Sequence, residues 1–246
     1  MTDGRLTRAR IAARTWARRH RRLHAAIRVV KYGPYRGFTD DRVRRSLLDR
    51  AWRNGWRILY LGSGGRRQPG MINVDITAET GPDVVADGYC LPFADGSFDL
   101  ILCEYVIEHV PDPERFLAAA SRVLKPDGLW YLEVPFLQPW HGGADFQRWT
   151  TEGFRGALTR AGLEAERHGV HMGAGFIAFW FVREWLALLL SGGWKPARAV
   201  LSWVLGFILS PLLLSDLAFL RLAGTAELAC GNYFVARRAN PKGAAP

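Results

Sequence analysis

The sequence of 246 residues predicts an α/β fold, in which helices cover both faces of a mostly parallel β-sheet. Short apolar runs typical of buried strands alternate along the chain with segments that have helical periodicity and helix-capping residues. A glycine-rich turn, Gly62–Gly65, follows the first of these runs, and several later runs end on an acidic residue. Ligands of such sheets bind beyond the carboxyl ends of the strands. The glycine turn and the acids therefore predict a binding site at that edge.

The first elements carry the clearest signal. A helix over residues 40–54 precedes the apolar run 58–61, and the glycine turn separates that run from a second one that ends on Asp75. Glycines let a backbone approach a ligand, and a carboxylate can hold two ribose hydroxyls. Asp75 follows Gly64 by only 11 residues, whereas a dinucleotide fold places its acid about 20 residues on, after a helix. The sequence thus predicts a nucleotide or nucleoside site with almost no first helix.

The later elements continue the alternation of strands and helices. Residues 83–87 form a short strand ending on Asp87, and residues 97–104 form a buried strand ending on Glu104. Asp112 and Pro113 are typical of a helix start, and this helix runs to Leu124. The remaining expected elements are a strand over 129–134, a helix from Thr150 or Thr151 to Gly162, and strands over 165–172 and 229–237.

Four segments, taken together, resemble the class I S-adenosylmethionine-dependent methyltransferases, and in particular a bacterial group associated with cell-surface glycans. They are LGSGG (61–65), NVDI (73–76), ADGYCLPFADGSFDLILCEYVIEHVPDPERF (86–116) and RVLKPDGLWYLEVPF (122–136). A fifth segment, HGGADFQRWTTEGF (141–154), is similar to a pattern of the same group. The resemblance implies a Rossmann-like seven-stranded sheet, with a shortened first helix, and S-adenosylmethionine as cofactor.

The resemblance also implies roles for individual residues. Gly62, Ser63 and Gly64 would back the methionine part of the cofactor. Asp75, with Ile76 beside it, would hold the ribose hydroxyls. Asp87 would reach the adenine amino group, with Gly88 and Tyr89 alongside, and Glu104 and Tyr105 would line the floor of the site. The sequence departs from the family pattern at Tyr60, where an acid is usual, and at Arg66, where a third glycine is usual.

The acceptor side of the site is expected after the strand 129–134. His141 is a candidate general base, Asp145 could orient it, and Arg148 could hold a carboxylate or phosphate of the acceptor. The alternatives are a loop-stabilising hydrogen bond for His141 and an internal salt bridge that shapes the lid for Asp145 and Arg148. Glu108-His109 lacks the further ligand of a Glu-x-x-Glu-His metal motif, so we expect a structural pair and no metal.

The net charge of +10 comes from the N-terminal part of the chain. Residues 1–57 hold 17 Lys and Arg against four Asp and Glu, whereas the rest is close to neutral. Residues 5–31 repeat apolar side chains at helical spacing among arginines, which predicts a basic amphipathic helix within an extension over residues 1–39. Such a helix can dock on the domain or lie on an anionic membrane. Nucleic acid is the least favoured partner, because no aromatic platform accompanies the arginines.

An apolar, Trp-rich insertion over residues 173–228 divides the core, which comprises residues 40–172 and the last strand within 229–246. Residues 199–215 carry no charge, a length at the low end for crossing a bilayer, and Arg183-Glu184 argues against a spanning helix earlier in the insertion. We expect a helical hairpin in or on the membrane; a soluble cap or an oligomer interface are the alternatives.

Three cysteines without metal or disulfide spacing fit a reducing compartment. The sequence thus favours a protein on the inner face of the cell membrane that O-methylates a small-molecule, glycan or lipid-linked acceptor. A methyltransferase for a soluble metabolite or nucleic acid, and a non-catalytic protein with this fold, are the alternatives.

Overall fold

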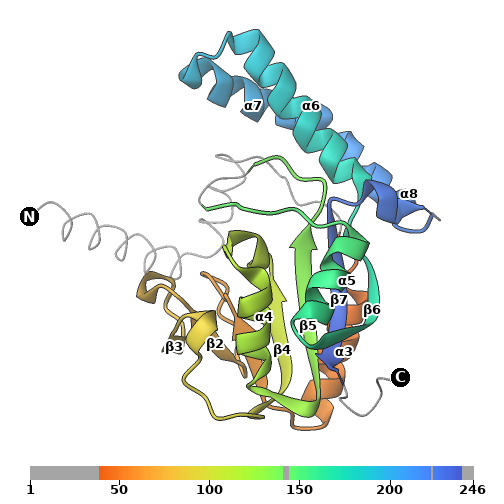
Figure 1. The fold of residues 1–246 in the computed structure, drawn as a ribbon. Helices are drawn as coiled ribbons and strands as arrows, with labels where there is room; N and C mark the ends of the chain where they lie inside the picture. Colours follow the sequence, from red (N-terminus) through yellow and green to blue (C-terminus); the bar gives the residue numbers. More distant parts are fainter. Residues whose placement is uncertain (1–38, 141–143, 223, 240–246) are drawn as a thin grey trace, which may run out of the picture.

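A computed structural model describes residues 39–140, 144–222 and 224–239 of the chain (Figure 1). The predicted basic helix over residues 5–31 and His141 lie outside the described residues. The described part begins beside the C-terminal end of a core strand, because Thr39 forms a β-bridge with Met172 and the Asp40 N–H donates to the His171 carbonyl at 2.8 Å.

The core is a seven-stranded sheet with the order β3-β2-β1-β4-β5-β7-β6. The first five strands in this order are parallel, and β7 runs antiparallel to both of its neighbours. The strands are β1 (Ile58–Leu61), β2 (Ile72–Asp75), β3 (Val84–Val85), β4 (Phe98–Glu104), β5 (Leu124–Pro135), β6 (Leu163–Met172) and β7 (Gly231–Arg238). Residues 62–71 between β1 and β2 contain no helix, as the short spacing predicted. The predicted α/β fold with a trimmed first helix is confirmed.

Helices cover both faces of the sheet. In Figure 1, α4 (Pro113–Ser121) and α5 (Thr151–Arg160) lie in front of the strands, and α3 (Arg42–Arg53) lies behind them. Alternate residues of each strand point to the two faces, so β1 sends Leu59 and Leu61 into the α4–α5 core and Ile58 and Tyr60 into the α3 core. Each large apolar side chain buried in this way stabilises the fold by about 1.5–3 kcal/mol.

The insertion between β6 and β7 is a helical hairpin that projects from the core at the end where β4 and β5 finish (Figure 1). Its elements are α6 (Ala174–Ser191), α7 (Lys195–Leu209), the 3-10 segment η4 (Ser210–Ser215) and the short α8 (Asp216–Phe219). Asp216 fixes the root of the hairpin, because its buried carboxylate accepts from the N–H groups of Gly175 at 2.7 Å and Phe176 at 3.0 Å. One side chain at the end of the insertion therefore caps the helix that begins it.

Candidate cofactor and acceptor site

A cavity of about 450 Å³ opens at the carboxyl ends of β1, β2 and β4. Six of the predicted cofactor residues and Tyr89 line it: Gly62, Asp75, Ile76, Asp87, Gly88, Tyr89 and Tyr105. The lining also includes residues that the motifs did not single out: Leu61, Ala86, Val106, His109, Val110, Pro111 and Phe116. Most of these are apolar, which suits a flat aromatic or ribosyl ligand with a few polar contacts.

The glycine turn is held tightly at the floor of the cavity. The N–H groups of Gly62 and Ser63 both donate to the Val74 carbonyl, at 2.9 and 3.0 Å. Gly62 has a φ of +71°, and a Cβ atom built on it would lie 2.3 Å from a methyl carbon of Val106. Glycine is therefore required at this position by both backbone conformation and space. Ser63 is buried and Gly64 lies beside the cavity, but neither residue is part of its lining.

Asp75 and Asp87 place carboxylates at the rim. Asp75 accepts from the Gly64 N–H at 2.6 Å and from the Thr77 N–H at 3.1 Å, so its two oxygens are oriented by backbone. Asp87 accepts from the Tyr89 N–H at 3.0 Å. The intervening Gly88 is buried against Phe116, since a Cβ there would lie 2.1 Å from that ring. Both acids therefore belong to the lining of the cavity, together with apolar residues such as Phe116.

An adenosyl cofactor of the kind the resemblance implies fits this cavity. Its volume lies within the usual range for small-molecule sites. A Cβ built on Gly64 meets nothing within 4 Å, so there is open space beside the Asp75 carboxylate. Asp75 would hold ribose hydroxyls, Asp87 would accept from an exocyclic amine, and Val110 and Phe116 would contact the base. Within the described residues, no group of three or more His, Cys, Asp or Glu is arranged to hold a metal ion.

Glu104 faces away from the cavity. Its carboxylate pairs with Arg44 of α3 and accepts from the Tyr60 hydroxyl at 2.9 Å, on the α3 side of the sheet. Tyr60 thus joins a buried polar cluster with Glu104, at the position where the family usually has an acid. The following residue, Tyr105, lines the cavity with a φ of +54°, the one positive φ among the described non-glycine residues. Such strained backbone is concentrated at functional sites.

The same cluster continues on β5 and β6. The Tyr131 hydroxyl donates to Glu133 at 2.9 Å, and Nδ1 of His171 lies 3.3 Å from the same carboxyl group. Burial, reinforced by the nearby Glu104, raises the pKa of Glu133 to about 8. Burial also lowers the pKa of His171. The cluster lies on the α3 side of the sheet, and none of its residues lines the cavity.

Asp145 and Arg148 form an ion pair within a strap of residues 144–149 that crosses the end of the sheet. Arg148 donates to the carboxylate of Asp145 at 2.6 Å and to the carbonyls of Gln138 and Pro139, both at 3.2 Å. The Asp145 side chain is 1% exposed. These contacts are those of the lid-shaping salt bridge, because the guanidinium is engaged by its own loop.

Glu108 and His109 lie beneath this strap. Nδ1 of His109 is in hydrogen-bond contact with the Ala144 carbonyl, and the Phe146 N–H donates to the Glu108 carbonyl at 2.8 Å. Sequence reasoning treated the two as a structural pair, and it did not foresee that His109 lines the cavity. The sequence signal that could have indicated this is the position of the two residues, three and four places after Tyr105, which also lines the cavity.

Comparison with known proteins agrees with this geometry. A family model described as a methyltransferase domain matches residues 66–132. An uncharacterized methyltransferase of Mycobacterium avium is 31% identical over 142 residues, 54% of this chain and 55% of that protein. A second, from Mycolicibacterium paratuberculosis, is 36% identical over 142 residues, 54% of each chain. The chain therefore spans about half the length of these curated relatives.

Shorter matches and solved structures extend the comparison. A ubiquinone biosynthesis O-methyltransferase of Xanthomonas oryzae is 36% identical over 63 residues, 26% of this chain and 24% of that protein. A putative sarcosine dimethylglycine methyltransferase from Galdieria sulphuraria superposes with a TM-score of 0.51 at 15% identity, covering 82% of this chain and 92% of that one. The cyclase SpnF gives a TM-score of 0.51 at 16% identity, covering 92% and 96%. At this identity the structures show the fold alone.

The strand order, the family match and the named relatives point the same way. The association with surface glycans stays a prediction. Residues 66–132 match a methyltransferase domain, and about half of the chain is similar to curated methyltransferases, on a fold shared with solved methyltransferase structures.

Proposed function

We propose that the protein transfers a methyl group from S-adenosylmethionine to an oxygen of a glycan, a lipid-linked sugar or another lipid-bound acceptor at a membrane surface. In this proposal the hairpin and the predicted basic helix meet the inner face of the cell membrane. The oxygen acceptor is supported by the name of one relative, an O-methyltransferase of ubiquinone biosynthesis. The membrane setting is supported by the surface of the hairpin.

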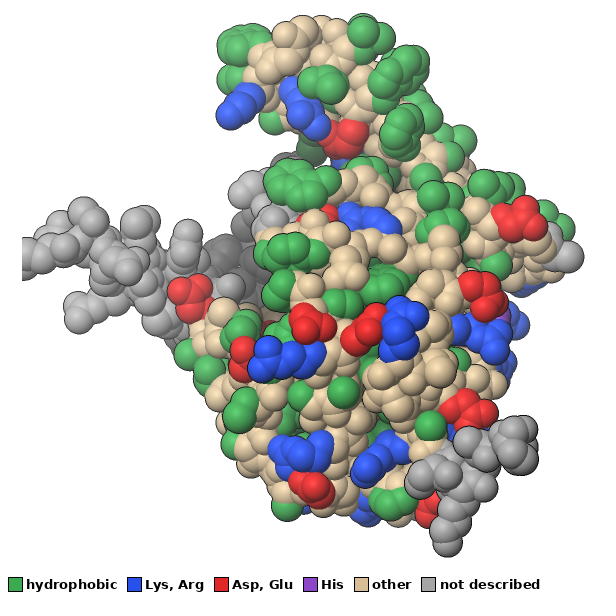
Figure 2. Space-filling view, in the orientation of Figure 1, with side chains coloured by type: hydrophobic (Ala, Val, Ile, Leu, Met, Phe, Trp, Pro, Cys, Tyr) green, Lys and Arg blue, Asp and Glu red, His purple; other side chains and the backbone are tan. Residues whose placement is uncertain are grey.

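The outer surface of the hairpin carries the proposal, because it is apolar where a water-soluble hairpin would be polar. Every exposed residue of α6 is apolar, and so is every exposed residue of α7 after Lys195. The large ones are Phe181, Trp185, Leu188, Leu189, Leu190, Val200, Trp203, Val204, Phe207 and Ile208. Figure 2 shows hydrophobic side chains gathered over this region. Transfer of this surface into lipid would gain on the order of 10 kcal/mol.

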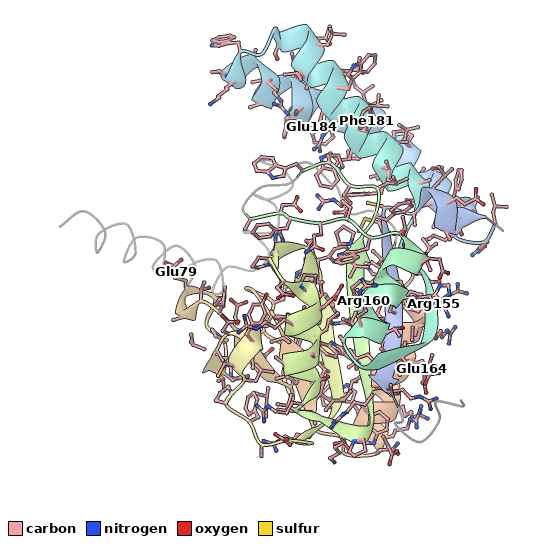
Figure 3. The ribbon with its side chains drawn as sticks, viewed as in Figure 1. Glu79, Arg155, Arg160, Glu164, Phe181 and Glu184 are labelled. Carbon is pink, nitrogen blue, oxygen red and sulfur yellow. The ribbon has the colours of Figure 1, made fainter. Side chains whose placement is uncertain are left out.

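A small polar cluster links the two helices of the hairpin, with Glu184 at its centre. Glu184 of α6 accepts from Arg198 of α7 at 3.0 Å and from Ser202 at 3.2 Å, and Arg183 pairs with Glu184 at 2.8 Å. Glu184 and Phe181 are labelled on α6 in Figure 3. Pairing lowers the cost of placing charges in a membrane. The Arg183-Glu184 pair, which argued against a spanning helix in the sequence, is thus compatible with a hairpin that lies in the membrane interface.

Among the described residues, two segments have the length and composition of membrane-crossing helices, Ala174–Ser191 and Lys195–Phe219, and 17% of an apolar 18-residue window in each is buried. Such helices are weak support by themselves, because core helices pass the same test. Their low burial is what separates them from core helices. The apolar outer surface and the few charged residues, Arg183, Glu184 and Arg198, suit a hairpin that lies in the membrane interface.

The cofactor supplies a methyl group bound to a sulfonium, and in-line transfer requires the acceptor about 3 Å from it with water excluded. Asp75 and Asp87 would orient the nucleoside, and the strap held by Asp145 and Arg148 would cover the acceptor side. Tyr105 and Val106 form the adjoining wall. The hairpin would then deliver a lipid-anchored acceptor to this edge of the sheet.

Two measurements test the proposal with full-length protein. In flotation, we expect the protein to rise with vesicles of phosphatidylcholine and phosphatidylglycerol, and the triple variant Phe181→Ser/Trp185→Ser/Leu189→Ser to rise at least tenfold less. Val85→Ser, which changes an equally exposed residue of β3, is the matched control. In the second measurement, the protein is incubated with membranes from the source organism and S-adenosylmethionine carrying a radiolabelled methyl group, and the label should enter the lipid-extractable fraction. Protein that stays unbound, or label found only in water-soluble products, would contradict the proposal.

A further inference from the structure

A second cavity, here called the α4–α5 groove, lies between the start of α4, the end of α5 and the strap. It measures about 660 Å³, within the usual range for small-molecule sites. Its lining is Pro111, Asp112, Pro113, Glu114, Phe146, Gln147, Trp149 and Arg160. Pro111 also lines the cofactor cavity, so the two cavities adjoin at this residue. A ligand in the groove would therefore lie beside the cofactor site.

The groove contains hydrogen-bonding atoms that the protein itself does not use. Arg160 contacts Glu114 from Nε at 2.8 Å and from Nη2 at 2.7 Å, and both contacts are to Oε1. Asp112 uses only Oδ1 to cap α4, and Gln147 donates through Nε2 to the Val110 carbonyl at 3.2 Å. Among the described residues, the remaining oxygens of these three side chains have no hydrogen-bond partner. The groove thus offers acceptor oxygens beside a guanidinium that is held in place.

Phe146 of the strap adds a flat apolar surface to the same groove. It is 55% exposed, although phenylalanine is among the residues most often buried. Its N–H donates to the Glu108 carbonyl at 2.8 Å, which ties the backbone of the strap to the core at this point. The strap therefore holds an aromatic ring in the wall of the groove while more than half of the residue stays open to solvent.

The charge and shape of these groups distinguish between classes of ligand. The lining has two carboxylates against one guanidinium, which disfavours a phosphate or a nucleic acid. A lipid chain would cover these charged groups without giving them partners, which is costly. A sugar suits the groove, because its hydroxyls can donate to carboxylates and accept from a guanidinium. The C–H face of a sugar ring can also pack against the negative face of an aromatic ring.

We propose that the α4–α5 groove binds a sugar unit of a glycan acceptor, other than the unit that is methylated. This rests on the proposed function, and it selects glycan acceptors over other lipid-bound ones. The sugar ring packs on Phe146, and its hydroxyls bond to Glu114 and to Arg160, which is labelled on α5 in Figure 3. The unit is not the methylated one, because the groove adjoins the part of the cavity where Val110 and Phe116 would contact the base. Contacts remote from the reacting atoms act on KM more than on kcat.

An array of bacterial surface glycans tests the groove without requiring methyl transfer. Fluorescently labelled full-length wild type in detergent micelles should bind at least one glycan. Phe146→Ala and Arg160→Met should each bind that glycan at least tenfold less, while their Kd for S-adenosylmethionine, measured by calorimetry, stays within twofold of wild type. The matched controls are Trp52→Ala, which removes an exposed aromatic side chain of α3, and Arg237→Met, which breaks the exposed pair with Glu164. Both controls should bind the glycan as wild type does.

A second readout connects the groove to the reaction. With membranes from the source organism and S-adenosylmethionine carrying a radiolabelled methyl group, Phe146→Ala should raise the amount of membrane needed for the half-maximal rate at least fivefold. An unchanged amount would overturn the proposal. Wild type that binds no glycan, or groove variants that bind as wild type does, would also overturn it, even where membranes are methylated. Glycan binding that depends on Phe146, without methylation of any membrane, would support the groove as a sugar site and refute the proposed function instead.

Discussion

The substitution Glu133→Gln should make the protein more stable at alkaline pH. Glutamine has the volume of glutamate, and its carbonyl can still accept from Tyr131, which donates at 2.9 Å in the native protein. Burial and the neighbouring Glu104 raise the pKa of Glu133 from 4.5 to about 8. Between these values the unfolded chain ionises while the folded protein keeps its proton. The free energy of unfolding therefore falls as pH rises through this window, and the loss is complete above the folded pKa.

The size of the effect follows from the shift. One pKa unit corresponds to about 1.4 kcal/mol, so the shift of Glu133 has an upper limit of about 5 kcal/mol. Because Glu104 and His171 share the cluster, about half of this is a realistic value. Urea unfolding at pH 5 and pH 8.5 measures it. The decrease between the two pH values should be about 2–3 kcal/mol smaller in Glu133→Gln than in wild type.

The control is Glu164→Gln, which removes an exposed carboxylate, labelled in Figure 3, that pairs with Arg237. A surface pair of this kind contributes little, so its pH dependence should match wild type. Glu108, whose pKa is also raised, is present in all three proteins and cancels from the difference. An identical pH dependence in wild type and Glu133→Gln would refute the reasoning, because Glu133 would then ionise as readily in the folded protein as in the unfolded chain.

Three further outcomes are expected. Gly62→Ala should weaken the binding of sinefungin, an analogue of S-adenosylmethionine, at least tenfold in calorimetry and lower the Tm. The reason is that the added Cβ would meet Val106 at a position with positive φ, and a wild-type Kd would contradict this. Asp75→Ala should weaken binding of the same ligand by about 1–3 kcal/mol while circular dichroism stays unchanged, because an oriented carboxylate is lost. Asp216→Ala leaves two N–H groups of α6 without their acceptor, so hydrogen exchange at the start of α6 should accelerate at least tenfold while β4 keeps its protection.

Much of the fold followed from local patterns. The glycine turn and its short distance to Asp75 predicted a sheet that lacks the first helix, and the terminal acids predicted the edge where the cavity lies. The order of the strands, with β7 between β5 and β6, was not predicted from the sequence, because no local pattern encodes which strands pair.

The direction of Glu104 shows where sequence reasoning stopped short. Leu100, Leu102 and Glu104 alternate on one face of β4, the face that α3 covers, so the two-residue period already directed this acid away from the cavity. The prediction that Glu104 lines the site used only its place at the end of the strand and was wrong, because it did not take the two-residue period into account. The polar seam of the hairpin was beyond the sequence for a different reason. Which side of α6 meets α7 depends on packing, and the apolar residues surround the helix almost completely.

The insertion has a further consequence for the design of variants. Met172, which ends β6 before the insertion, and Gly231, which begins β7 after it, are direct partners in the antiparallel ladder, and the Cys230 N–H donates to the Met172 carbonyl at 2.8 Å. The two ends of a segment of more than 50 residues thus meet at one point, where an ordinary tight turn would close the same ladder. Segments whose ends coincide can lengthen, shrink or be exchanged at little entropic cost to the rest of the domain. Different insertions can therefore be grafted at this junction onto one unchanged sheet.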